Sequence, residues 1–159
     1  MGPNMDPIAV ATGAFLVVGL QTRTTNRIEA VPEMAKIVPL WRKFCDDKVS
    51  DRVPHRLPGS SEVFAVYFDF KSGYQDQYSL IVGHKVSSLD NLPPDMGGVL
   101  IRGGRYLRFP VEARTVAALV DAWRAIWQFF DLTHEYERTY GTDYEVYRGD
   151  EVEIYVGVK

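Results

Sequence analysis

Apolar side chains recur at helical spacing along residues 116–130 of the chain. They follow one another as i, i+3, i+4 and i+7, which describes one apolar face of a helix: Val116, Leu119, Val120, Trp123, Ile126, Trp127 and Phe130. Thr115 is suited to cap the start of this helix. A first helix is predicted over residues 32–46, where Pro32 fits the first turn and Pro39 should bend the helix or delay its start.

The segments around these helices are short and rich in β-branched and aromatic residues, which is typical of strands. We expect strands over residues 15–22, 63–70, 78–86, 106–111, 144–148 and 152–158. Gly103-Gly104 interrupts a longer candidate strand over residues 99–111, so a bulge or bend is expected there. Residues 54–61 and 92–95 are rich in Pro, Gly, Ser and Asp, which indicates loops.

The chain contains an internal repeat. Both predicted helices carry an apolar pair, two spacers, Trp-Arg, one spacer and an apolar residue. The matched segments, in order, are 37–44 with 119–126, Val66-Tyr67 with Val146-Tyr147, and 80–85 with 154–159. Because the three matches keep the same order at offsets of roughly 82, 80 and 74 residues, we infer a duplicated unit of strand, helix, strand and strand.

Two such units predict an α+β fold, with an antiparallel sheet that carries two helices on one face. Helices related by a pseudo-two-fold axis cannot both cover the centre of the sheet, so a groove is expected between them. The length of 159 residues fits one domain. We place it at residues 15–159, with halves at about 15–86 and 98–159, after a flexible segment over residues 1–14.

Charge and composition exclude several classes of partner. The net charge of −3 and the lack of a Lys/Arg cluster argue against direct binding of nucleic acid. A lone cysteine, Cys45, excludes an internal disulfide, and the scattered His55, His84 and His134 indicate no metal site. The apolar stretch over residues 8–20 is too short and too interrupted to cross a membrane. We expect a cytoplasmic protein without a cofactor.

Aromatic residues reach 13% of the chain. This surplus fits a well-packed core, but it also suits a groove that stacks planar ligands. Trp41, Trp123 and Trp127 lie on the predicted apolar helix faces, either as core residues or as groove walls that attract a cation. Tyr67 and Tyr147 are repeat mates, so we expect them at symmetric positions in the groove.

Glu145 is the candidate charged residue of the groove, and Tyr106, after the Gly-Gly bend, is expected at its mouth. Glu145 shares one strand face with Tyr147. Its repeat equivalent is Ala65, so the repeated unit does not need a carboxylate to fold. A buried carboxylate is costly without a counter-charge, which a cationic ligand would supply. The alternative is that Glu145 faces solvent on an edge strand.

Five segments, taken in order, resemble the GyrI-like, or AraC-type, effector-binding domain: residues 78–83, 103–109, 123–127, 143–147 and 153–159. The freestanding members carried on integron cassettes are the most similar subgroup, and the resemblance covers about Phe15 to Lys159. It implies a ligand groove between the two halves that often receives hydrophobic cations. It also implies a buried glutamate on the penultimate strand, which Glu145 matches. Multidomain relatives carry a preceding DNA-binding domain, for which we expect no room here.

The residues leave more than one function open. The first hypothesis is a binding protein for a small hydrophobic or cationic ligand. The second is a GyrI-like hydrolase of strained or electrophilic molecules, in which Glu145 acts as the general base that activates water. Further alternatives are a protein partner whose peptide occupies the groove and a homodimer.

Overall fold

The computed structural model describes residues 7–71 and 76–159 of the chain. Within this part, eight strands form one antiparallel sheet, accompanied by three α-helices and a short 3-10 helix. In chain order the elements are β1 (Ile8–Thr12), β2 (Phe15–Thr24), α1 (Asn26–Glu29), α2 (Ile37–Asp46), the 3-10 helix η1 (Val49–Asp51), β3 (Val63–Phe68), β4 (Tyr78–Val86), β5 (Gly97–Ile101), β6 (Gly104–Val111), α3 (Val116–Leu132), β7 (Thr142–Arg148) and β8 (Glu151–Val158). The predicted α+β class is confirmed.

The sheet repeats one arrangement twice. Its strand order is β1-β6-β8-β7-β3-β4-β2-β5. From the centre outward, one half therefore reads β3, β4, β2 and the other reads β7, β8, β6. The first strand of each half crosses to the other half, because β1 pairs with β6 and β5 pairs with β2. The predicted unit of strand, helix, strand and strand is present, with one exchanged strand added at its start.

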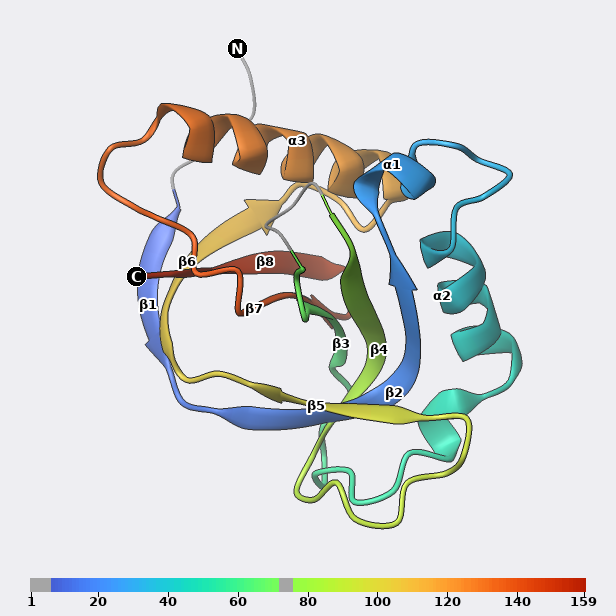
Figure 1. The fold of residues 1–159 in the computed structure, drawn as a ribbon. Helices are drawn as coiled ribbons and strands as arrows, with labels where there is room; N and C mark the ends of the chain where they lie inside the picture. Colours follow the sequence, from blue (N-terminus) through green and yellow to red (C-terminus); the bar gives the residue numbers. More distant parts are fainter. Residues whose placement is uncertain (1–6, 72–75) are drawn as a thin grey trace.

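The segments β1–β2 and β5–β6 behave as two long, bent strands. Thr12 pairs with Gly104 and Phe15 pairs with Ile101, so one antiparallel register continues across the bend. Gly104 has a φ of +147°, a conformation that glycine adopts without a steric penalty. The interruption predicted at Gly103-Gly104 is therefore a bend. The sheet curls, and α2 and α3 lie on its outer side (Figure 1).

Each face of the curled sheet buries its own set of side chains. The inner face packs on itself through Val17, Phe64, Val66, Ile81, Val99, Ile101, Tyr106, Tyr144, Val146 and Tyr155. On the outer face, α2 packs on β2 and β4, and α3 packs on β6. The two helices thus cover the flanks of the sheet and leave its central strands, β3 and β7, as the floor of a groove.

The structure differs from the sequence prediction at two places in the first unit, its first strand and the start of its helix. Ile8–Thr12 forms β1, so the prediction of a flexible segment over residues 1–14 does not hold for this part; residues 1–6 lie outside the described residues. Helix α2 begins at Ile37 instead of Pro32. Pro39 then lies in the first turn, where its missing N–H is no loss, so the predicted delay of the helix start is correct.

The short helix α1 has no counterpart in the sequence prediction. Thr25 caps it by accepting a hydrogen bond from the backbone N–H of Ile28, with a distance of 3.0 Å.

Among the described helices, none has the length and apolar composition needed to cross a membrane.

Candidate ligand-binding site

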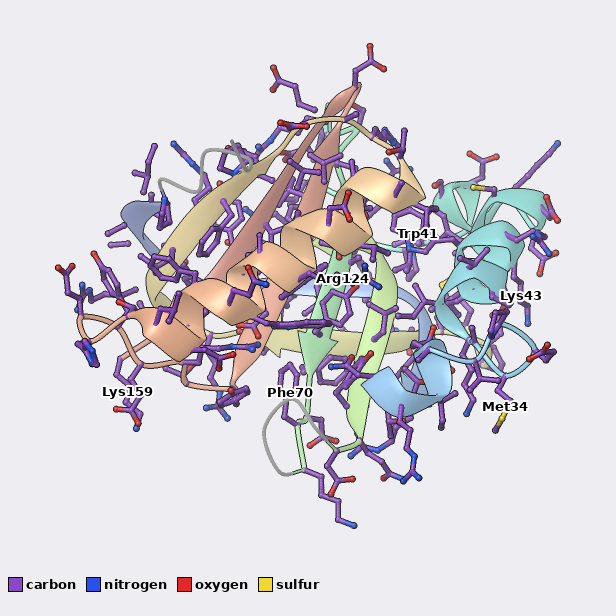
Figure 2. All side chains as sticks on the ribbon, turned by 90° about the horizontal axis from the view of Figure 1, so that it is seen from above. Met34, Trp41, Lys43, Phe70, Arg124 and Lys159 are labelled. Atoms are coloured by element: carbon purple, nitrogen blue, oxygen red, sulfur yellow. The ribbon has the colours of Figure 1, made fainter. Side chains whose placement is uncertain are left out.

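A cavity of about 380 Å³ opens between α2 and α3, above the central strands of the sheet. Viewed from above, Trp41 and Arg124 lie in the space between these two helices (Figure 2). Seven aromatic side chains line the wall: Trp41, Tyr67, Phe70, Tyr78, Trp123, Trp127 and Tyr147. A cavity of this size suits one small organic molecule, since ligand pockets commonly measure roughly 300–1,000 Å³.

The two helices contribute equivalent residues to the wall. Ile37, Val38 and Trp41 of α2 line the cavity, and so do their repeat mates on α3, Leu119, Val120 and Trp123. Val38 and Val120 remain 45% and 42% exposed, which makes the mouth of the cavity apolar. The duplication of the sequence therefore produces a cavity with matching apolar walls on both sides.

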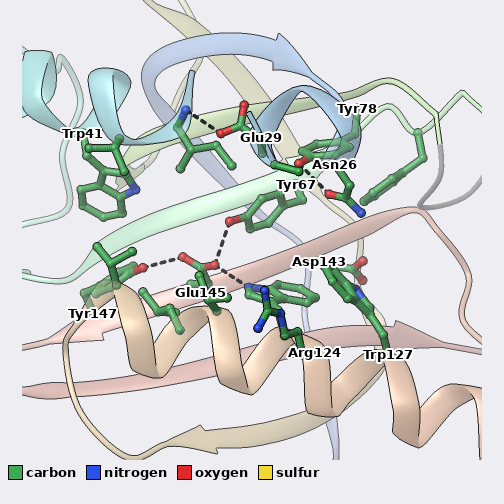
Figure 3. Close-up of a pocket in the computed structure, with 18 of the residues that line it drawn as sticks. Asn26, Glu29, Trp41, Tyr67, Tyr78, Arg124, Trp127, Asp143, Glu145 and Tyr147 are labelled. Carbon is green, nitrogen blue, oxygen red and sulfur yellow. Dashed lines mark hydrogen bonds between the residues drawn. The ribbon is translucent and has the colours of Figure 1, made fainter. Parts of the chain in front are cut away.

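Glu145 lies at the floor of the cavity, on the central strand β7 (Figure 3). It is 3% exposed. Its Oε2 accepts hydrogen bonds from the Tyr67 hydroxyl and the Trp123 indole Nε1, both at 2.8 Å, and its Oε1 accepts one from the Tyr147 hydroxyl at 2.5 Å. The alternative of a solvent-facing glutamate on an edge strand is wrong.

Burial raises the pKa of Glu145, and the hydrogen bonds from Tyr147, Trp123 and Tyr67 act in the opposite direction. All three donors are neutral, and no cation forms an ion pair with Glu145 within the described residues. Burial also raises the pKa of Tyr67 and of Tyr147, and the nearby carboxylate raises both further. Both phenols therefore stay protonated and donate at neutral pH.

The aromatic side chains around Glu145 pack in two equivalent pairs. The rings of Trp41 and Tyr147 lie 4.8 Å apart at 72°, and those of Trp123 and Tyr67 lie 5.4 Å apart at 71°. Each pair is edge-to-face, a favourable geometry for aromatic rings. The pairs differ in one respect. Trp123 donates to Glu145, whereas no hydrogen bond joins the Trp41 indole to any other described residue.

Asp143, two residues before Glu145, also borders the cavity, but its charge is balanced within the protein. Its side chain is fully buried, and Oδ2 pairs with Nη2 of Arg138 at 2.7 Å. Oδ1 accepts a hydrogen bond from the backbone N–H of Gly157 at 2.8 Å. Burial raises the pKa of Asp143, while Arg138 and the Gly157 hydrogen bond lower it.

Glu29 brings a further carboxylate to the wall from α1. It accepts hydrogen bonds from Thr24 Oγ1 at 2.7 Å and from the backbone N–H groups of Lys36 and Ile37 at 2.9 and 3.0 Å. Glu29 thereby satisfies free N–H groups at the start of α2. Its position links α1 to the helix that carries Trp41.

The structure brings together six of the seven residues that the sequence predicts for the site: Glu145, Trp123, Trp127, Tyr147, Tyr67 and Trp41. Tyr106 lies elsewhere. It is 3% exposed and belongs to the inner face of the sheet, where its hydroxyl contacts the backbone oxygen of Arg102 and Thr142 Oγ1. Its predicted place at the groove mouth is wrong, because alternation along β6 turns Tyr106 away from the helices.

Sequence reasoning missed Glu29, Tyr78, Arg124 and Asp143, all of which border the cavity. The strand period carried a signal for Asp143, which shares a face with Glu145 and Tyr147. Glu29 and Tyr78 come from a four-residue helix and the far strand β4, so no local pattern marks them. Among residues 7–71 and 76–159, no three His, Cys, Asp or Glu side chains lie together as metal ligands.

Comparison with known proteins now identifies the family. The family model described as Cass2, integron-associated effector binding protein, matches residues 10–158. The chain belongs to this family. An integron cassette protein of Vibrio cholerae is 25% identical and covers 99% of this chain and 100% of its own, with a TM-score of 0.81. The resemblance to freestanding GyrI-like domains is therefore confirmed.

More distant structures share the fold. SAV2435, solved with bound tetraphenylphosphonium, is 12% identical over 98% of this chain and 94% of its own, with a TM-score of 0.78. The C-terminal domain of EcmrR is 13% identical over 99% of each chain, with a TM-score of 0.62. No curated protein sequence matches this Cass2 family member. Family membership supports small-molecule binding as its function class.

Proposed function

We propose that this Cass2 family member binds hydrophobic, aromatic cations in the cavity between α2 and α3, with Glu145 as their counter-charge. One observation carries the proposal. Glu145 is a carboxylate that is almost fully buried, its pKa is raised by burial, and its hydrogen-bond donors are all neutral. A buried charge without a counter-charge is unfavourable, so a ligand cation relieves a cost that the empty protein carries.

The walls support the same ligand class. Indole and phenol rings attract a cation to their faces, and Trp41, Tyr67, Trp123 and Tyr147 surround the carboxylate. The apolar mouth favours a ligand with hydrophobic substituents. The bound tetraphenylphosphonium of SAV2435, which shares this fold, is a molecule of that kind.

A matched pair of ligands tests the role of charge. Methyltriphenylphosphonium and triphenylphosphine oxide are similar in size, but only the first is a cation. Glu145→Gln should weaken binding of the cation about ten- to a hundredfold, the range for a charge-assisted contact, and should change binding of the oxide far less. Glu33→Gln alters the net charge equally at an exposed position and serves as the control. Equal losses for both ligands in Glu145→Gln would contradict the proposal.

The hydrolase alternative uses the same carboxylate and predicts a different result. A small epoxide incubated with the protein should then be consumed, as followed by mass spectrometry, and Glu145→Gln should stop the reaction. Glu145-dependent turnover in a protein that binds no cation would replace the binding proposal.

A further inference from the structure

The charged groups around the cavity differ in how far the protein itself satisfies them. Asp143 is paired with Arg138, and Glu29 is held by Thr24 Oγ1 and two backbone N–H groups. Glu145 accepts three hydrogen bonds from neutral donors. Arg124 is different, because its guanidinium makes no hydrogen bond or ion pair with any residue in the described ranges.

Arg124 follows Trp123 directly on α3 and belongs to the strip of this helix that borders the cavity, at four-residue spacing from Val120. Figure 3 shows its side chain extending from α3 toward the cavity that holds Glu145. Arg124 is exposed, while Val120, one turn before it on α3, is apolar. A guanidinium offers five N–H donors in a planar fork that fits a carboxylate in a bidentate manner.

The position of Arg124 is not repeated on the other wall. Its repeat mate, Arg42 on α2, does not line the cavity, although the neighbouring pair Trp41 and Trp123 both do. The second half of the chain therefore supplies both the Glu145 carboxylate on the floor and the Arg124 guanidinium at the α3 wall. A cavity of about 380 Å³ places both within reach of one drug-sized molecule.

A purely cationic ligand gains from Glu145 but is repelled by Arg124. A ligand that also carries an anionic group avoids this repulsion and forms charge-assisted hydrogen bonds with the guanidinium. We propose that the preferred ligands are zwitterionic aromatic molecules, in which a cationic centre faces Glu145 and a carboxylate or similar anion faces Arg124. This inference rests on the proposed function and names a narrower ligand class for the same cavity.

The test uses 1-benzylquinolinium and its 3- and 4-carboxylates, which share one aromatic cation and differ in the anion and its position. Wild-type protein should bind at least one carboxylate as tightly as the parent cation or more tightly. Arg124→Gln should weaken that carboxylate about tenfold or more and should leave binding of the parent unchanged or slightly tighter. Arg42→Gln, the repeat mate outside the cavity, should change neither affinity.

Two results would overturn the assignment: a wild type that binds both carboxylates more weakly than the parent cation, or an Arg124→Gln variant that affects parent and carboxylate alike. Because Arg124 is exposed and has no described partner, the variant should unfold in urea at the wild-type midpoint, which separates binding from folding. Glu145→Gln tested on the parent cation reads the proposed function separately. If Glu145→Gln does not weaken the parent cation but Arg124→Gln still weakens the carboxylate, only the anion site stands. If Glu145→Gln weakens the parent cation but Arg124→Gln does not weaken the carboxylate, only the cation site stands.

Discussion

Ala65 and Glu145 are direct cross-strand partners in the ladder between β3 and β7, and they are also equivalent positions of the two repeats. A pseudo-two-fold axis of the sheet must therefore pass between them. Tyr67 and Tyr147, two residues beyond Ala65 and Glu145, are likewise equivalent positions of the two repeats, and both donate to the carboxylate. The carboxylate lies close to the axis and within reach of both halves, although only one half supplies it.

Moving the carboxylate across this axis should preserve cation binding. Glu145→Ala should weaken binding of methyltriphenylphosphonium about ten- to a hundredfold. Adding Ala65→Glu should recover most of the loss, because cross-strand Cβ atoms lie only about 5 Å apart and both tyrosine hydroxyls remain. Calorimetric titration of the three proteins measures the effect. Ala65→Gln in the same background is the control and should recover nothing. If the folded Ala65→Glu protein does not recover binding, the two equivalent positions are not interchangeable for the carboxylate.

The stability of the empty protein should fall as pH rises, through the contribution of Glu145. Its pKa in the folded protein is raised by burial, so the folded state holds this proton to higher pH than the unfolded state does. The contribution is fully present below the ordinary carboxyl pKa and is lost as pH rises through the raised value. Urea unfolding at about pH 5 and about pH 8 should therefore show a smaller stability loss for Glu145→Gln than for wild type. Equal losses would mean that the folded protein does not perturb this carboxyl.

Trp41 and Trp123 give a matched pair of variants for the hydrogen bond to Glu145. Cation binding should strengthen as pH rises, because only the ionised carboxylate attracts the ligand. Trp123→Phe removes a donor that favours the ionised form, so the midpoint of this rise should move to higher pH. Trp41→Phe makes the same change of ring at the equivalent position of the other repeat but removes no hydrogen bond to Glu145. The midpoint of this variant should therefore stay at the wild-type pH. Calorimetric affinities for methyltriphenylphosphonium across pH provide the measurement, and a common shift in both variants would contradict the asymmetry.

Much of this fold could be predicted because short local patterns of residues reveal the repeat. The Trp-Arg matches predicted the two helices, and the paired Val-Tyr segments predicted the central strands. The place of Tyr106 could not be obtained in this way. Period-two alternation separates Tyr106 from Leu107, but only the packed structure decides which of the two faces the helix.

Strand β1 is a whole element that local sequence patterns could not predict. Its five residues, Ile8–Thr12, are followed by Gly13, and their partner strand β6 lies almost a hundred positions further along the chain. No local signal reports such a pairing. Removing residues 1–12 should therefore destabilise the protein by a few kcal/mol, since each lost ladder hydrogen bond contributes about 1 kcal/mol. Chemical denaturation compares this protein with one that lacks only residues 1–6; similar midpoints would mean that β1 contributes little.

The buried pair of Arg138 and Asp143 is the most sensitive point of the cavity wall. Both side chains are almost fully buried and lie 2.7 Å apart, and the Arg138 guanidinium also packs over the ring of Tyr140 at 4.4 Å. Arg138→Met leaves Asp143 without its counter-charge, which should lower the free energy of unfolding by about 3–5 kcal/mol. Arg148→Met, which breaks surface pairs with Glu62 and Glu153, should cost about 1 kcal/mol or less.

The deficit of Arg138→Met should also depend on pH in a defined direction. Burial already raises the pKa of Asp143, and Arg138 is the strongest influence that lowers it. Without Arg138, the pKa rises further, so the folded variant protonates Asp143 and regains stability as pH falls. Adding Asp143→Asn should remove both the pH dependence and most of the deficit, because no charge is left buried. Urea unfolding of the single and double variants across pH measures this, and a deficit that persists in the double variant would assign the loss to Arg138 packing on Tyr140 instead of to the ion pair.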